Sequence, residues 1–209
     1  MIWIKVILAL LASYLIGSVP VGYVIGKVFY HKDIRAGGSG NIGATNALRM
    51  FGTTVGILSL ILDMCKGFIV VIVAKSLFGP ASALPVLCAL AAILGHIFTI
   101  FLKFKGGKGV ATAGGAFLAL APLALLLALI SFLLITTLTR YVSLGSILGA
   151  LGFGIMIWVQ QLSSPQPNYL MAVICTPVVL MIIYKHKANI GRLLKGTENK
   201  VKFSKKGNA

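Results

Sequence analysis

Long apolar stretches separated by short polar intervals run through most of the chain. A helix needs about 20 apolar residues to cross the hydrocarbon core of a bilayer, so these stretches are candidate membrane crossings. They are residues 4–29, 53–78, 84–102, 114–138, 144–161 and 169–184. Polar loops at 31–52, 103–112 and 139–146 and a basic tail from residue 185 separate or follow them. The pattern predicts a single polytopic, all-α integral membrane domain over residues 1–209.

Basic residues are concentrated in some polar intervals and absent from others. Lysines and arginines number 19 against three acids, and the formal net charge is +16. All three loops are basic, and the tail from residue 185 holds eight bases. The links 79–83 and 163–167 hold none. Because basic loops tend to stay in the cytoplasm, we predict an extracytoplasmic N-terminus and a cytoplasmic C-terminus.

The stretch 114–138 does not fit this orientation as a single crossing. Lys108 and Arg140 flank it, and the charge pattern places both in the cytoplasm. Its 25 residues are too few for two full crossings. Pro122 can end a short helix, because proline lacks an N–H and its ring blocks the preceding turn. We therefore predict a partial helix up to about Ala121, a second helix back to Arg140, and about seven transmembrane helices in all.

The composition excludes several classes of protein. The chain is 58% hydrophobic and only 11% charged, whereas a soluble domain carries about 25% charged residues. Its bases lie between apolar spans, and no nucleic-acid-binding module is present, so we predict no nucleic-acid partner. The three cysteines occur singly within apolar runs, which is neither a disulfide framework nor a metal-ligand spacing. We expect no metal and no cofactor.

The first polar loop combines glycines with hydrogen-bond donors. Its segment 36–49 holds the glycines at 37, 38, 40 and 43 and the polar residues Ser39, Asn41, Thr45, Asn46 and Arg49. Glycines let backbone N–H groups turn toward an anion, and arginine adds a charged fork. The alternative is a flexible loop with one orienting arginine. The match to the dinucleotide fingerprint G-x-G-x-x-G is accidental, because no strand precedes it.

The second loop, 104–112, interleaves Lys105 and Lys108 with Gly106, Gly107 and Gly109. It is not a Walker A loop, because position 102, where the first glycine is required, is a leucine. Glycine backbone, lysines and a following helix start nevertheless suit a phosphate. The alternative is a basic cluster that only sets the orientation.

Three further polar groups lie in or near the predicted spans. His96 lies near the cytoplasmic end of a span, where it is either a packing residue or a functional one. Asp63 and Lys66, three residues apart on one helix, are expected to pair, with a structural role favoured over a catalytic one. His186 and Asn189 are expected to continue one face of the last helix as it leaves the membrane.

Several signatures of catalysis are absent from the sequence. No pair of catalytic carboxylates, HEXXH motif or GxSxG elbow occurs. No histidine is followed five positions later by aspartate, as is usual in glycerolipid acyltransferases. Residues beyond Gly196 are interpreted as a solvated basic tail.

Four segments resemble a known family. GSGNIGATNALR, HIFTIFLKFKGGKGVAT, RYVSLGS and HKANIGRLLKGTE, in this order along the chain, are similar to the motifs of the bacterial acyl-phosphate-dependent glycerol-3-phosphate acyltransferases of the PlsY type. The resemblance implies transfer of a fatty acyl group from acyl phosphate to the 1-hydroxyl of glycerol 3-phosphate. The product is lysophosphatidic acid, an early intermediate of phospholipid biosynthesis. The resemblance also implies seven helices in the bacterial cytoplasmic (inner) membrane, with the motifs on the cytoplasmic side.

The same resemblance implies the residues of the site. The glycerol-3-phosphate-binding residues would be Ser39, Thr45, Asn46, Arg49, Lys108, Ser146, His186 and Asn189. The acyl-phosphate-binding residues would be Lys105, Gly106, Gly107 and Gly109. The acyl chain would lie between helices, open to membrane lipid.

The proton acceptor and the function leave alternatives open. A substrate phosphate oxygen can take the proton, and the rival is His96 or His186 as general base. A transporter or exchanger of phosphorylated small solutes would also need basic glycine loops. It is disfavoured because the donors cluster on one side. A lipid-binding scaffold would not need so many donors.

Overall fold

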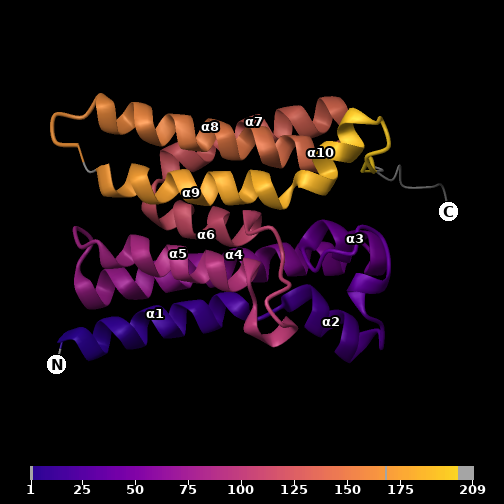
Figure 1. Cartoon of the computed structure of the whole chain (residues 1–209), viewed down its shortest axis with the longest axis horizontal. Coiled ribbons are helices and arrows are strands. Elements are labelled where there is room, and N and C mark those ends of the chain that lie inside the picture. The colour runs from indigo at the N-terminus through magenta and orange to yellow at the C-terminus, as the bar shows by residue number, and fades with distance from the viewer. Residues whose placement is uncertain (1, 168, 202–209) are drawn as a thin grey trace.

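The computed structural model describes residues 2–167 and 169–201, and this part of the chain is helical without strands. Its α-helices are α1 (Ile2–Ser18), α2 (Val21–Phe29), α3 (Ala44–Phe51), α4 (Thr53–Phe78), α5 (Leu84–Ile97), α6 (Val110–Leu120), α7 (Pro122–Thr139), α8 (Val142–Leu162), α9 (Tyr169–Lys185) and α10 (Lys187–Leu194). Two 3-10 turns, η1 (Ile34–Ala36) and η2 (Ile100–Leu102), lie in the loops. The long helices run along the longest axis of the molecule (Figure 1). The predicted all-α class is confirmed.

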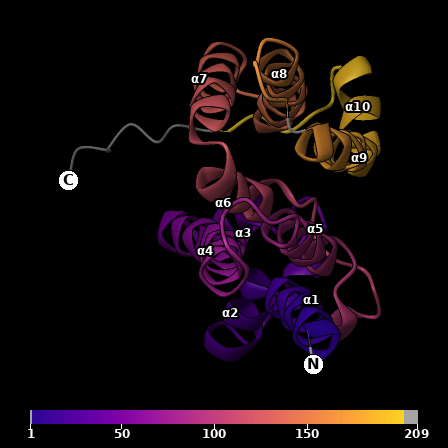
Figure 2. The same ribbon diagram turned by 90° about the vertical axis from the view of Figure 1, so that its left-hand side faces the viewer.

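The helices form two groups that meet at α6. One group holds α1 to α5, the other holds α7 to α10, and α6 lies between them (Figure 2). Close packing of α6 on α4 depends on two glycines: a Cβ on Gly67 would overlap the carbonyl oxygen of Thr112, and one on Gly115 would overlap that of Met64. Small residues thus let these two backbones approach, as is common between membrane helices.

Four helices of the described chain are long and apolar enough to cross a membrane, and six spans result if each bent pair of helices counts as one. The first bent pair covers the predicted span 4–29 and shows that its helix is not continuous. The chain breaks between Ser18 and Val21, and α1 and α2 meet at 47°. Pro20 causes the break, since it cannot continue the hydrogen bonding of α1. At this break, Lys66 Nζ donates to the carbonyl oxygens of Gly17 and Val19.

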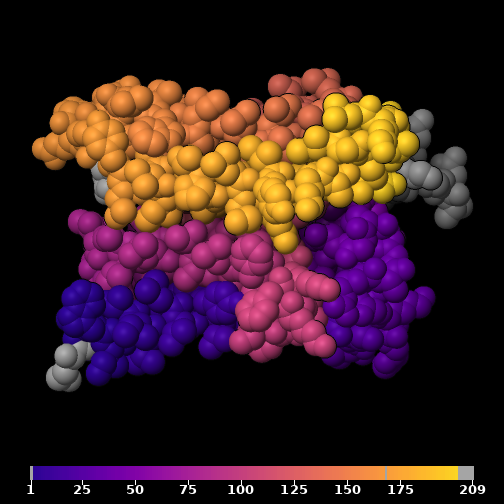
Figure 3. Space-filling model, viewed as in Figure 1, coloured from indigo at the N-terminus to yellow at the C-terminus, as the bar shows by residue number. Residues whose placement is uncertain are grey.

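The third predicted span keeps its bounds 84–102 as a candidate crossing, although its α-helical part is shorter. The helix α5 stops at Ile97, and residues 98–109 leave it as a loop. This loop lies on the surface beside the end of α1 (Figure 3), where Thr99 Oγ1 donates to the carbonyl oxygen of Ser18. The glycine segment then folds back, and the N–H groups of Gly106 and Gly107 donate to the last carbonyls of α5. The loop is therefore held against the helix that precedes it.

The predicted break at Pro122 is confirmed. The helix α6 ends at Leu120 after 11 residues, α7 begins at Pro122, and Arg140 follows its end. At 1.5 Å per residue α6 is about 17 Å long, which is roughly half the thickness of the hydrocarbon core.

The prediction that 186–189 continues one face of the last helix is wrong, because α9 ends at Lys185 and α10 leaves it at 53°.

Candidate active site

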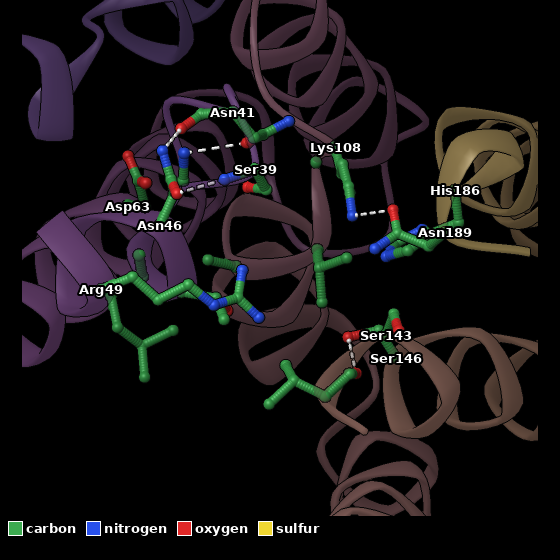
Figure 4. A pocket seen from close by; sticks show the side chains of 18 of the residues that line it. Ser39, Asn41, Asn46, Arg49, Asp63, Lys108, Ser143, Ser146, His186 and Asn189 are labelled. Carbon is green, nitrogen blue, oxygen red and sulfur yellow. Dashed lines mark hydrogen bonds between the residues drawn. The ribbon is translucent and has the colours of Figure 1, made fainter. Parts of the chain in front are cut away.

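Four polar segments that are distant in sequence line one pocket of about 140 Å³. They are the loop before α3 with α3 itself, the start of α6, the start of α8, and the junction of α9 with α10 together with Glu198. Asp63 of α4 and His96 of α5 add two single polar residues to them. The polar and charged lining residues are Ser39, Asn41, Thr45, Asn46, Arg49, Asp63, His96, Lys108, Ser143, Ser146, His186, Asn189 and Glu198. Figure 4 shows Arg49 and Lys108 on different elements, with their charged groups directed into the same space.

Asn46 holds the first loop in shape. Its side-chain NH₂ donates to the carbonyl oxygens of Ile34 (2.9 Å), Gly37 (3.2 Å) and Asn41 (2.8 Å). Its side-chain oxygen accepts from the N–H of Ser39 at 2.8 Å. The side chain is buried, and both its amide donors and its oxygen are hydrogen-bonded to backbone groups of the loop. The resemblance implied a substrate-binding role for Asn46. The residue lines the pocket, and it also positions Ser39 there.

The conformation of this loop also requires a glycine beside Asn46. Gly38 has a φ of +62°, and a Cβ there would overlap the Asn46 side-chain oxygen. Only glycine meets both conditions without strain. The glycines of the first motif therefore shape the loop around Asn46.

Arg49 and Lys108 supply the positive charge of the pocket. Both side chains are half-buried, and burial lowers the pKa of each below its usual value. For Lys108 the pKa falls to about 8, since burial and the charges of Arg192 and Arg49 outweigh the attraction of Glu198. Lys108 Nζ donates to Asn189 Oδ1 at 2.6 Å. The pocket therefore holds two cations in partly desolvated surroundings, which strengthens their attraction for an anion.

The structure places the four predicted acyl-phosphate-binding residues in different surroundings. Gly109 lines the pocket, with a φ of +84°. Gly106 and Gly107 lie behind it, against the end of α5, and a Cβ on Gly107 would overlap His96 Nε2. Lys105 is exposed and lies outside the lining of the pocket.

Glu198 is a site residue that the sequence reasoning missed. Its carboxylate accepts from Ser143 Oγ (2.8 Å), Asn189 Nδ2 (2.6 Å) and Arg192 Nε (2.7 Å). Burial alone would raise its pKa, but these three hydrogen bonds and the charge of Arg192 lower it. The interpretation of everything beyond Gly196 as a solvated tail is therefore wrong at this residue. Residues 202–209 of that tail lie outside the described chain.

Two other predicted residues lie at the start of α8 and at the bend between α9 and α10. Ser146 lines the pocket, and its hydroxyl donates to the carbonyl oxygen of Val142 at 2.8 Å. His186 Nδ1 lies 2.8 Å from the carbonyl oxygen of Ile182. Because a carbonyl only accepts, Nδ1 carries the hydrogen in the neutral ring, and Nε2 keeps a lone pair.

The expected pair of Asp63 and Lys66 is present and includes His96. Lys66 Nζ lies 2.7 Å from Asp63 Oδ1 and 3.4 Å from His96 Nδ1. Asp63 Oδ1 is 3.7 Å from the same ring nitrogen, which is too long for a hydrogen bond. The three atoms form a triangle, in which the ammonium of Lys66 lies close to both the carboxylate and the imidazole. Sequence reasoning favoured a structural role for Asp63 over a catalytic one, and both Asp63 and His96 line the pocket.

An apolar groove of about 230 Å³ adjoins the polar pocket. It lies among α4, α6, α7, α8 and α9, and most of its lining is aliphatic or aromatic. Five residues line both spaces: Leu60, Val110, Ala111, Phe132 and Ser146. A ligand with an anionic head and an apolar tail can therefore occupy both at once. Among the described residues no group of three His, Cys, Asp or Glu side chains is arranged to hold a metal ion.

Comparison with known proteins gives a consistent result. A family model described as glycerol-3-phosphate acyltransferase matches residues 7–196. The glycerol-3-phosphate acyltransferase of Trichlorobacter lovleyi is 48% identical, over 91% of this chain and 94% of that protein. Glycerol-3-phosphate acyltransferase 2 of Bacillus anthracis is 44% identical, over 93% and 98%.

Two solved structures share the fold. One is the crystal structure of PlsY (YgiH), an integral membrane glycerol 3-phosphate acyltransferase, in its glycerol 3-phosphate form. It matches with a TM-score of 0.87 and 37% identity over 95% of this chain and 96% of that one. The lysophosphatidic acid form of PlsY matches with a TM-score of 0.84 and 36% identity over the same shares.

Proposed function

The chain belongs to the glycerol-3-phosphate acyltransferase family and is a membrane acyltransferase of phospholipid synthesis, and we propose that its acyl donor is acyl phosphate. In this reaction a fatty acyl group passes to the 1-hydroxyl of glycerol 3-phosphate. The products are 1-acylglycerol 3-phosphate and inorganic phosphate. The proposal rests on one observation: a polar pocket with two cations opens onto an apolar groove.

The polar pocket suits the phosphate groups of both substrates. Arg49 can hold a phosphate with two parallel hydrogen bonds, and Lys108 can add a point charge. Neutral donors and acceptors surround them, and we assign glycerol 3-phosphate to the pocket on this basis. The residues proposed to contact it are Ser39, Thr45, Arg49, Lys108, Ser146, His186 and Asn189.

The donor phosphate is assigned to the glycine loop before α6. Gly109 lines the pocket, and the first N–H groups of α6 follow it directly. Such N–H groups at a helix start favour an anion. Gly106 and Gly107 support this loop from the end of α5, and Lys105 adds an exposed positive charge beside it. The fatty chain of the donor would then enter the apolar groove.

The chemistry needs alignment more than a protein nucleophile. Acyl phosphate is an activated anhydride. The hydroxyl oxygen of glycerol 3-phosphate forms a bond to the acyl carbon, and the bond from that carbon to the phosphate oxygen breaks. Phosphate leaves with both bonding electrons, and the hydroxyl proton passes to a phosphate oxygen. Two cations held close to these oxygens stabilise the negative charge in the transition state.

A histidine remains the rival proton acceptor. His186 leaves Nε2 free to accept a proton, because its Nδ1 donates to the backbone. His96 is less suited, since the ammonium of Lys66 lies 3.4 Å from its Nδ1 and opposes a positive charge on the ring. We propose that both histidines position substrate groups and that the phosphate oxygen takes the proton.

The site is proposed to face the cytoplasm, with the N-terminus outside and seven helices in the inner membrane. The meeting of all the basic loops at one pocket supports this orientation, since loops on opposite sides of a bilayer could not share it. Single cysteines placed in a cysteine-free variant test it. Labelling from outside should fail at positions 39, 108 and 140. Reaction at position 140 from outside would overturn the proposed return of α7.

The activity is tested with purified protein, labelled glycerol 3-phosphate and palmitoyl phosphate. We expect labelled lysophosphatidic acid, formed in proportion to released phosphate. Arg49→Ala should lower the rate by about tenfold to more than a hundredfold, as expected for a charge-assisted hydrogen bond of about 1.5–3 kcal/mol. Arg49→Lys keeps the charge and loses the fork, so it should retain part of the rate. Absence of the lipid product from wild-type protein would refute the proposed function.

A further inference from the structure

Two helices line the apolar groove with the same order of side-chain sizes. On α6 the lining passes from Ala111 to Gly114 and then to Phe117, at the spacing of one helix face. On α8 it passes from Ser146 through small residues to Phe153. The rings of Phe117 and Phe153 are in contact, with centroids 4.5 Å apart. Along these faces of α6 and α8, small residues therefore come before the aromatic pair, and Leu60 of α4 and Phe132 of α7 also line the groove.

The helix geometry gives the length of this passage. Phe117 lies six residues beyond Ala111, and Phe153 lies seven residues beyond Ser146. At 1.5 Å per residue, these intervals correspond to about 9 and 10 Å along the two helices. Ala111 and Ser146 line the polar pocket as well as the groove. An acyl chain whose carbonyl group lies in the polar pocket must run past Gly114 before it reaches the aromatic pair.

Gly114 differs from the glycines that let helices pack closely. A Cβ on Gly67 or Gly115 would meet the backbone of a neighbouring helix, whereas a Cβ on Gly114 would meet nothing within 4 Å. Gly114 is half-buried, and it lines the apolar groove but not the polar pocket. A glycine inside a helix lowers its stability relative to alanine. Helix packing does not require a glycine here, and the space beside it is groove.

We propose that Gly114 is a specificity-determining residue, whose missing side chain keeps the groove open to long fatty acyl chains. The inference rests on the proposed function, because it takes the groove as the acyl site. A leucine at this position would enter the groove about 4.5 Å beyond Ala111, at three residues of helical rise. Short acyl groups end before that point and still fit. Long chains collide with the new side chain.

The test compares donors of different length in two matched variants. Gly114→Leu is paired with Gly152→Leu, since Gly152 is also a half-buried helix glycine with open space at its Cβ but lines neither the pocket nor the groove. The values of kcat/KM are measured with butyryl, octanoyl and palmitoyl phosphate. In Gly114→Leu the ratio of palmitoyl to butyryl values should fall by about tenfold to 200-fold, the range for steric discrimination in apolar pockets. Gly152→Leu should keep the wild-type ratio.

Thermal unfolding separates this effect from damage to the fold. Leucine favours a helix more than glycine does, so the Tm of both variants should be unchanged or raised. An unchanged ratio in Gly114→Leu, or an equal fall in Gly152→Leu, overturns the inference. If Gly114→Leu does not accumulate, Gly114→Ala decides: selective loss of palmitoyl use supports the inference, and a wild-type ratio overturns it. A wild-type enzyme inactive with every acyl phosphate would instead refute the proposed donor.

Discussion

Lys108 Nζ and Asn189 Oδ1 are joined by a 2.6 Å hydrogen bond across 81 residues of sequence. The same amide donates to Glu198 Oε1 at 2.6 Å. Asn189 therefore points its acceptor to the cation of Lys108 and its donor to the carboxylate of Glu198, which is itself paired with Arg192. Lys108 keeps its remaining N–H donors for a substrate phosphate as a result.

We expect Asn189→Ala to lower kcat/KM by about tenfold to a hundredfold. The substitution leaves Lys108 without its orienting acceptor and Glu198 without one buried donor, each worth about 1–3 kcal/mol. Asn199→Ala is the matched control, because Asn199 is exposed in the same tail. Steady-state kinetics of both variants check this, and equal rates for the two would remove Asn189 from the proposed site.

The lowered pKa of Lys108 predicts a loss of activity in alkaline solution. Its pKa is about 8, and the charged form is the one that binds phosphate. The value of kcat/KM for glycerol 3-phosphate should therefore fall as pH rises through about 8. The substrate phosphate does not titrate there, since its second pKa is about 6. In Lys108→Arg the charge persists to much higher pH, so the fall should disappear. If the wild-type enzyme and Lys108→Arg gave superimposable pH profiles, the fall of kcat/KM in alkaline solution would be due to another group.

Asn46 is predicted to act through the loop and not by touching substrate. Asn46→Ala removes a buried partner from several backbone groups, so it should lower the free energy of unfolding by about 1–3 kcal/mol or more. Arg49→Ala is the comparison, because it should reduce turnover with little change in Tm. Thermal unfolding in detergent measures both variants. A stable but inactive Asn46→Ala protein would return Asn46 to the substrate-binding residues.

The glycine loop is predicted to be sterically constrained. In Gly107→Ala the new methyl group would overlap His96 Nε2, and relieving such overpacking costs about 1–3 kcal/mol. We expect acyl-phosphate use to be largely lost although every charge remains. Gly191→Ala is the control, because a Cβ there meets nothing within 4 Å. If alanine were tolerated at Gly106, Gly107 and Gly109 alike, the segment would be only a basic turn.

Substitution of the histidines tests the route of the proton. Glutamine in place of His96 or His186 can keep a hydrogen bond but cannot accept the proton, so measurable turnover should remain. A general base contributes about 10²–10⁴-fold. One variant that loses this factor, together with an ascending limb of the pH–rate profile, would identify that histidine as the base. Burial and the charge of Lys108 lower the pKa of His186 to about 4, so a limb due to His186 should lie near pH 4.

Parts of the fold could be predicted because local signals agreed with each other. The bounds 53–78 match α4, since an apolar run between two glycines leaves little choice. The break at Pro122 followed from charge, because Lys108 and Arg140 required the chain to return. The break at Pro20 was missed, since both halves together have the length of one crossing and no charge demands a turn. Pro177 lies inside α9 without ending it, so the presence of a proline alone does not determine where a helix ends.

The site was harder to predict than the spans, because its side chains find partners far along the chain. Sequence identified the donors around Asn46 but could not show that the loop itself uses them. Glu198 was missed because basic residues surround it in sequence, which is typical of a solvated tail. Its partners Ser143 and Asn189 are 55 and nine residues away. The one available signal was that Glu198 is the only acid in that tail.

The position of Glu198 also bears on how the enzyme is made. The loop before α3 and the starts of α6 and α8 leave the ribosome first, and the carboxylate that joins Ser143, Asn189 and Arg192 leaves it much later. A nascent chain stopped before that glutamate leaves Arg192 without its carboxylate partner and the pocket unfinished. Catalytic competence therefore arrives only after the helices that carry the rest of the site have been made.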